Sequence, residues 1–248
     1  MTGDVLYAIG DIHGYSGLLE PLLDAARQDA SDGRRTIVVG LGDYVDRGPD
    51  TPGVVERLLD IASHPNVEAH FLRGNQDQLL MDFLADHTLG PYWRRVGGQE
   101  TFEAYGVEPP SDREDMAAWL KARELFEANM PPRHRDFFRD LELSFSWGDY
   151  FFAHAGAQPG IPLEQQTAQD LLWIRRTFLD DERRFDRIVV HGHTPADEAY
   201  ADHRRVGLDT GAYMSGILSA CRFEGEDRLL IQAVARGDDR PEVQSRPL

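Results

Sequence analysis

The stretch TIVVGLGDYVDRGPDTPGVVERLLD (residues 36–60) contains the pattern that decides the fold. Its first six residues form an apolar run rich in β-branched side chains, which is typical of a buried strand. A turn rich in Gly and Asp follows, and from Thr51 onward apolar residues recur at helical spacing, with Pro52 in the first turn. Strand, turn and helix in this order predict an α/β sheet with functional loops at the carboxyl ends of its strands.

The same order of elements occurs on both sides of this stretch. Apolar runs at 5–9 and 68–72 predict two further strands, and the amphipathic segments 17–30 and 51–63 predict the helices between the three strands. Later, LELSFSWGDYFFAHAG (141–156) has the pattern of a hairpin that turns at Trp147-Gly148-Asp149.

Strand patterns return in the last third of the chain. They cover residues 187–192, 204–211, 216–225 and 228–236. The last three of these runs resemble an antiparallel meander. The polar, Pro-containing tail from Gly237 is expected to be loose.

Residues 82–142 differ in character from the rest of the chain. The segment is polar, contains scattered aromatic residues and is interrupted by the pairs Pro109-Pro110 and Pro131-Pro132. Its aromatic side chains need a packing partner, so we predict a helical cap inserted into a single domain that spans 1–248. Selection of the substrate would be the role of this cap.

Composition restricts the classes of partner. The chain has 43 acidic and 26 basic residues, a net charge of −17, and no long basic run, so a nucleic-acid duplex is a poor partner. Its only cysteine, Cys221, lies among apolar neighbours and is expected to be a core thiol. Because the sequence shows neither a leader pattern nor an apolar stretch of 18 residues, we expect a cytoplasmic protein without a membrane partner.

Five turns after predicted strands carry Asp, Asn or His side chains. Any one of them is most simply a turn former, but together they offer these side chains to one rim of the sheet. Mixed carboxylate, imidazole and amide ligands suit Mn, Fe or Zn, and the set is large enough for two ions. The turns are GDIHG (10–14), GDYVDRG (42–48), RGNQD (73–77), HAG (154–156) and HGHT (191–194).

These five ordered motifs, from about 11 to 211, resemble the phosphoprotein phosphatase branch of the calcineurin-like metallophosphoesterases, and especially its bacterial serine/threonine phosphatases. The resemblance implies an α/β (α+β) sandwich of mixed sheets flanked by helices, with two divalent metal ions, Mn before Fe or Zn. It implies that Asp11 and His13 bind the first metal and that Asp43 bridges both. The second metal would be completed by Asn75, His154 and His193.

The resemblance also assigns the groups that hold the substrate phosphate. Arg47 matches a phosphate-binding arginine of the family, and Asn75 would contact the same phosphate. Arg175 is similar to a second such arginine, with Arg176 as the alternative. His191 is expected to pack beside the ligands rather than bind metal. Asp149 and Asp209 are expected to be turn and structural residues.

Gln76 departs from the family pattern. A histidine that pairs with the aspartate at position 46 and protonates the leaving group is normal at this position. Glutamine cannot give up a proton, and general acid catalysis is worth about 10²–10⁴-fold in rate. Gln76 is therefore consistent with a natural preference for good leaving groups, with a substitution made to trap ligand, or with a proton donor elsewhere, such as His87 or His134.

The leading hypothesis from sequence is a metal-dependent phosphomonoesterase, in which water attacks phosphorus in line and Asp46, Gln76, Arg47 and Arg175 form the catalytic set. Phosphorylated serine or threonine side chains of proteins are the first expected substrates, with phosphotyrosine or a small phosphate ester as alternatives. A diadenosine tetraphosphate hydrolase and a catalytically impaired phosphate-binding module are the other two hypotheses. The sequence gives no indication of the oligomeric state.

Overall fold

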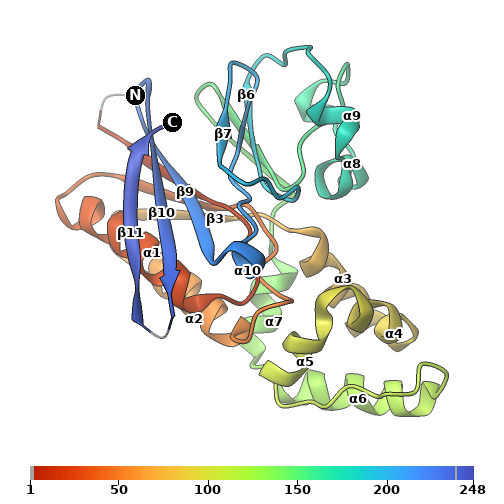
Figure 1. The fold of residues 1–248 in the computed structure, drawn as a ribbon. Helices are drawn as coiled ribbons and strands as arrows, with labels where there is room; N and C mark the ends of the chain where they lie inside the picture. The colour runs from red at the N-terminus through yellow and green to blue at the C-terminus, as the bar shows by residue number, and fades with distance from the viewer. Residues whose placement is uncertain (1–2, 238) are drawn as a thin grey trace.

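Two mixed β-sheets stack against each other in the computed structural model, which describes residues 3–237 and 239–248 (Figure 1). The six-stranded sheet has the order β11-β10-β9-β1-β2-β3, and the five-stranded sheet has the order β4-β5-β6-β8-β7. The strands are β1 (Val5–Ile9), β2 (Thr36–Gly40), β3 (Val67–Phe71), β4 (Ser144–Trp147), β5 (Tyr150–Ala153), β6 (Ile188–His191), β7 (Tyr200–Ala201), β8 (Arg205–Gly207), β9 (Ile217–Glu224), β10 (Asp227–Arg236) and β11 (Asp239–Pro247).

Both faces of the six-stranded sheet are covered, which explains why its central strands read as continuous apolar runs. Along β1, Tyr7 and Ile9 face the core beneath helices α1 (Ser16–Ser31) and α2 (Thr51–Ala62). Leu6 and Ala8, which alternate with them, face the core shared with the second sheet. Helix α2 begins as the sequence predicts, since the Asp50 carboxylate accepts the Gly53 N–H at 2.9 Å.

Helices fill the region between β3 and β4. They are α3 (Asn75–Ala85), η1 (His87–Leu89), α4 (Gly90–Trp93), η2 (Arg94–Gly98), α5 (Gln99–Ala104), α6 (Met116–Asn129) and α7 (Pro132–Arg139). Except for α7, which lies beneath the sheets, these helices form a separate lobe (Figure 1). The Trp93 and Phe102 rings, 4.6 Å apart between centroids, form its buried core with Phe83, Trp119 and Phe126.

The smaller elements lie near the second sheet and the strand ends. They are η3 (Leu163–Gln165), α8 (Ala168–Trp173), α9 (Arg176–Leu179) and α10 (Ala212–Ser215). Within the described part of the chain, no helix has the length and apolar character needed to span a bilayer.

Two predictions about the last third of the chain are wrong. The tail from Gly237 is not loose, because β11 pairs antiparallel with β10 from Leu229 opposite Pro247 to Arg236 opposite Asp239. This pairing uses backbone hydrogen bonds, so it does not need the apolar side chains that the tail lacks. The predicted meander of three runs is also incorrect. Its first run, β8, pairs with β6 and β7 in the second sheet, and of the three runs only β9 and β10 pair with each other.

Candidate metal centre

The turns after β1, β2, β3, β5 and β6 bring their polar side chains to one place. Two groups of buried ligand atoms form there, each within 4.8 Å: Asp11 with His13 and Asp43, and Asp43 with His154 and His193. Asp43 belongs to both groups, which is the position that a bridging carboxylate needs. The structure thus brings together the residues predicted for both metals, while their ligand roles remain predictions.

The backbone of these turns explains why the ligands converge. His13, Asp43 and His193 have φ values of 49°, 52° and 64°, in the left-handed region that non-glycine residues rarely adopt. Such strained positions persist when the surrounding structure holds them, and they concentrate at functional sites. At Gly74 and Gly192, a Cβ atom would collide with the side chains of Asp43 and Asp11, so glycine is required for the close approach of the turns.

The protonation states in the site suit divalent cations. Burial raises the pKa of Asp43 to about 6 and holds the pKa of Asp11 well above its ordinary value, because the two carboxylates lie together away from water. Burial lowers the pKa of His154 to about 4 and that of His13 to about 3, so both imidazoles are neutral at pH 7. Arg47 and Arg175 compensate only part of the buried carboxylate charge, since the pKa of Asp43 and that of Asp11 stay raised beside them.

Hydrogen bonding provides an independent test of the fit to metal. The Nδ1–H of His154 donates to the Leu41 carbonyl at 2.9 Å, so its Nε2 carries a lone pair. The Asn75 Oδ1 lies 3.0 Å from that Nε2, which places two acceptors face to face. The Nε2 of His193 is buried without a hydrogen-bond partner among the described residues. A cation shared by these atoms would satisfy them, so the residues fit the predicted second metal.

Two arginines approach the site from different elements. Arg47 donates its backbone N–H to the Gly97 carbonyl of the helical lobe at 3.0 Å and its guanidinium to His13 Nε2 at 2.9 Å. Its guanidinium also lies 4.4 Å from the centre of the Tyr213 ring. Arg175 donates to the His193 carbonyl at 3.1 Å and to the Thr194 hydroxyl at 3.2 Å.

Arg176 makes no hydrogen bond or ion pair to the metal-site residues in the described structure. The choice of Arg175 over Arg176 is therefore consistent with the geometry.

Gln76 and Asp46 are not paired, contrary to what the resemblance implies. The Gln76 N–H donates to Asp43 Oδ1 at 2.9 Å, and its side-chain oxygen is buried without a partner in the described chain. The Asp46 carboxylate instead accepts the Trp93 indole N–H at 3.0 Å and the Thr101 hydroxyl at 2.7 Å. Burial raises the pKa of Asp46 well above its ordinary value. Donors from the helical lobe therefore take the place of the expected partner.

Neither alternative proton donor contacts the candidate ligands among the described residues. His134 is bound on both ring nitrogens, to Glu56 at 2.6 Å and to the Tyr105 hydroxyl at 2.8 Å, so it links α7 to α2 and α5. His87 lies at the start of η1 and makes no side-chain hydrogen bond to the site. Neither His87 nor His134 therefore takes the place of the histidine that the resemblance implies at position 76.

Other polar residues near the site have packing roles. His191 lies in contact with the Gly192 carbonyl and Arg205, at 3.0 and 3.2 Å, and belongs to neither ligand group. Asp149 lies in the β4–β5 turn, as expected.

Asp209 accepts the Gly211 N–H at 2.9 Å, in agreement with the expected turn role. It is also only 4% exposed, and its charge helps to raise the pKa of Asp11, so it contributes to the electrostatic environment of the candidate metal centre as well.

Sequence reasoning also underestimated Asp77. Its carboxylate accepts three backbone N–H groups, from Asp43 at 2.9 Å, Tyr44 at 3.0 Å and Gly74 at 2.8 Å. It thereby joins the turn after β2 to the start of α3. Tyr213 was missed altogether, because nothing in its local sequence indicates that it stacks on Arg47 and packs edge-on against His13.

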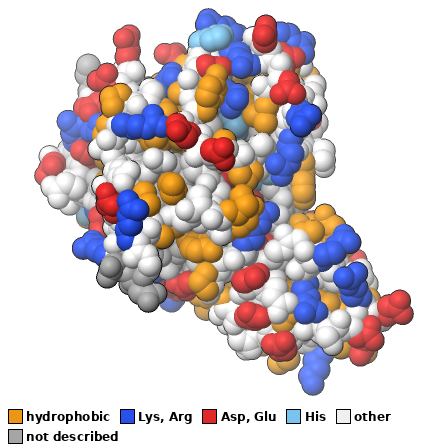
Figure 2. Space-filling view, viewed as in Figure 1, with side chains coloured by type: hydrophobic (Ala, Val, Ile, Leu, Met, Phe, Trp, Pro, Cys, Tyr) orange, Lys and Arg blue, Asp and Glu red, His pale blue; other side chains and the backbone are white. Residues whose placement is uncertain are grey.

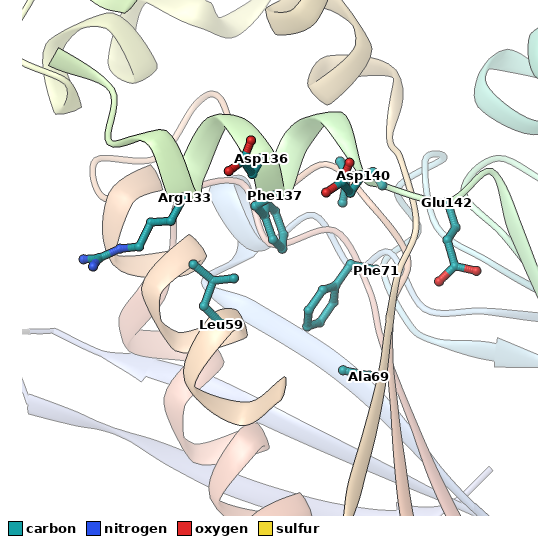
Figure 3. Close-up of a pocket in the computed structure, with 9 residues that line it drawn as sticks. Leu59, Ala69, Phe71, Arg133, Asp136, Phe137, Asp140 and Glu142 are labelled. Carbon is teal, nitrogen blue, oxygen red and sulfur yellow. The ribbon is translucent and has the colours of Figure 1, made fainter. Parts of the chain in front are cut away.

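One cavity lies apart from this centre. It has a volume of about 390 Å³ between α2, β3 and α7, and Leu59, Phe71 and Phe137 form its apolar walls (Figure 3). None of the residues that line it is a candidate metal ligand.

A sandwich of mixed sheets with two metal-binding groups at its rim defines a class, and the family model described as calcineurin-like phosphoesterase matches residues 5–237. The chain belongs to this family, whose members are metal-dependent phosphoesterases. It is similar to the asymmetrical bis(5'-nucleosyl)-tetraphosphatase PrpE of Geobacillus thermodenitrificans, with 28% identity over 87% of this chain and 89% of the relative. It is also similar to serine/threonine-protein phosphatase 1 of Salmonella typhimurium, with 25% identity over 88% and 92%.

The fold resembles that of a putative diadenosine tetraphosphatase of known crystal structure. The TM-score is 0.57 and the identity 20%, over 99% of this chain and 94% of the other.

Proposed function

We propose that this metallophosphoesterase hydrolyses phosphate compounds with good leaving groups, and dinucleoside polyphosphates before phosphoserine. The observation that carries the proposal is the glutamine at position 76, where the resemblance implies a histidine that protonates the leaving group. Gln76 cannot donate a proton to a leaving group, and Asp46 is already bound by Trp93 and Thr101. A nucleotide phosphate leaves without added protonation far more readily than a serine alkoxide. The similarity to the Geobacillus tetraphosphatase supports the same substrate class.

The residues of the site would act by position and charge. Divalent cations held by Asp11, His13, Asp43, Asn75, His154 and His193 would supply charge neutralisation and activate the attacking water; we propose Mn²⁺. Arg47 and Arg175 would hold the phosphoryl oxygens from two sides with planar guanidinium donors. Attack by water forms one P–O bond while the bond to the leaving phosphate breaks in line. Negative charge would develop on the leaving oxygen, because Gln76 cannot protonate it.

A protein phosphatase acting on phosphoserine, phosphothreonine or phosphotyrosine is the second candidate. The similarity to the Salmonella phosphatase, which covers 88% of this chain, favours it. Of these side chains, phosphotyrosine has the best leaving group and would tolerate Gln76 most easily. The cytoplasmic location predicted from the sequence suits either candidate. A phosphate-binding module without turnover is the outcome if Gln76 abolishes catalysis.

The variant Gln76→His tests the missing acid. Steady-state hydrolysis in Mn²⁺ is measured for a phosphoserine peptide and for p-nitrophenyl phosphate, whose phenolate leaves without help. If the proposal is right, the new imidazole raises phosphoserine turnover by about 10²-fold and changes aryl ester turnover by less than about 3-fold. The exposed residue Gln28 on α1 provides the control variant Gln28→His. Equal gains on both substrates, or none on either, would contradict a leaving-group role for position 76.

A further inference from the structure

A pocket of about 250 Å³ in the helical lobe is lined by three arginines. Arg94 and Arg95 open η2, and Arg113 lies in the loop before α6. Gln99 and Ser111 supply the other polar groups of the lining. We call this site the arginine pocket. The lower-right lobe of the space-filling view carries both basic and acidic side chains on the face that is visible (Figure 2).

The three guanidinium groups lack the ion pairs that arginines of the nearby helix α7 have. Arg135 lies 3.0 Å from Glu127, and Arg139 lies 2.8 Å from Asp140. No described carboxylate lies within 4 Å of Arg94, Arg95 or Arg113, even though acidic residues outnumber basic ones by 43 to 26.

Asp112 and Glu114 flank Arg113 in sequence, but they do not line the pocket. The Asp112 carboxylate is instead taken by the Glu114 backbone N–H at 2.9 Å. Three adjacent positive charges without compensation favour the binding of an anion.

The hydrogen bonds of the pocket leave guanidinium donors without acceptors among the described residues. Arg94 is fixed by two bonds of 2.7 Å, from Nε to Gln99 and from Nη1 to the Pro110 carbonyl, and its other terminal nitrogen stays free. The Arg95 guanidinium lies 5.4 Å from the Tyr92 ring centroid and makes no hydrogen bond in the described chain, and neither does the Arg113 side chain. One held and two exposed guanidinium groups thus offer planar donors without a local acceptor, and such donors match the oxygens of a phosphoryl group.

We propose that the arginine pocket is a second phosphoryl-binding site, separate from the metal centre. The two sites are linked through η2, which begins with Arg94 and Arg95 and contains Gly97, whose carbonyl accepts the Arg47 N–H at 3.0 Å. Arg94 and Gly97 are only three residues apart in this short segment, so an anion held by Arg94 would steady the segment that positions Arg47. The site takes a phosphoryl group from a phosphate chain or from a phosphorylated side chain, and it does not depend on which compound is hydrolysed.

Calorimetric titration of inorganic tripolyphosphate into the metal-free protein tests this site. Wild type is compared with the double variant Arg95→Gln/Arg113→Gln, which changes two exposed side chains and leaves the hydrogen-bonded Arg94 in place. The matched control is Arg135→Gln/Arg139→Gln, and Arg47→Ala reports on binding at the metal centre. We expect saturable binding that weakens at least 10-fold in the pocket variant, changes less than 2-fold in both others, and weakens with added NaCl.

Unchanged affinity in the pocket variant, no saturable binding by wild type, or loss of binding only in Arg47→Ala would each overturn the proposal. A doubly phosphorylated peptide is titrated in parallel to distinguish the two sources of phosphoryl groups. Of tripolyphosphate and the peptide, the one whose affinity falls more in the pocket variant represents the class of ligand that this pocket binds. Melting curves of both double variants check that the fold is retained.

Discussion

Replacing Asp77 with alanine should remove the contact that holds the metal-binding turns together. Its carboxylate accepts the N–H groups of Asp43, Tyr44 and Gly74 at 2.8–3.0 Å, and Asp77 is fully buried. A buried N–H left without a partner costs about 1–3 kcal/mol, so three would cost about 3–9 kcal/mol if the terms added. Water entering the space of the lost carboxylate reduces this, and we predict about 4 kcal/mol, a large part of the 5–15 kcal/mol typical of a domain.

Urea unfolding followed by circular dichroism, in EDTA, measures this loss without a contribution from metal. Asp77→Asn, which keeps the shape but exchanges one acceptor for a donor, should lose about 1–2 kcal/mol. Asp82→Ala is the control, because among the described residues that carboxylate on the same helix accepts a single side-chain donor, from Gln78 at 2.7 Å. Manganese affinity should also fall in Asp77→Ala, since the Asp43 turn loses its support. A loss below about 1 kcal/mol with unchanged manganese affinity would refute the reasoning.

Three further predictions concern the phosphate, the core and the metals. Arg175→Gln should reduce kcat/KM about 10–100-fold by removing a charged donor, while Arg176→Gln changes it less than about 2-fold; equal effects would show that Arg175 does not face the substrate. Burial raises the pKa of Cys221 to about 12, so its thiol should not react with a disulfide reagent at pH 8 until guanidinium unfolds the chain; fast labelling of the native protein would contradict this. Saturating Mn²⁺ should raise Tm by roughly 5–10 °C. The variant His193→Ala should lose most of this gain, while the control His203→Ala, in an exposed loop, should keep it. An equal gain in both variants would exclude His193 as a ligand.

Local sequence predicted the elements whose signals are local. The apolar run of 5–9 coincides with β1, and Pro52 in the first turn marks the start of α2, because strand burial and helix initiation are properties of a few adjacent residues. The partners of β8 and β11 were missed. Strand pairing is decided between distant segments, and neither the short run of β8 nor the polar alternation of β11 specifies its neighbour.

For the candidate site too, the features with local sequence signals were predicted and those that depend on distant residues were not. The turn motifs predicted which side chains converge, because each motif contains its own glycine and its own candidate ligand. The environment of Asp46 could not be read from its motif, since its donors Trp93 and Thr101 lie 47 and 55 positions further along the chain. The orientation of Arg175 depends on the break before α9, where this residue has φ −134° and ψ −108°. Such backbone breaks have no distinct local pattern.

The most direct test of the central claim is to measure kcat/KM of the wild-type protein on three substrates, with Mn²⁺ and again with EDTA. The substrates are diadenosine tetraphosphate, p-nitrophenyl phosphate and a phosphoserine peptide, which differ chiefly in how well the leaving group departs unprotonated. The account predicts activity that disappears in EDTA and a kcat/KM for the anhydride and the aryl ester at least about 10² above that for phosphoserine. Phosphoserine hydrolysed as fast as the other two, or turnover that survives removal of metal, would contradict it.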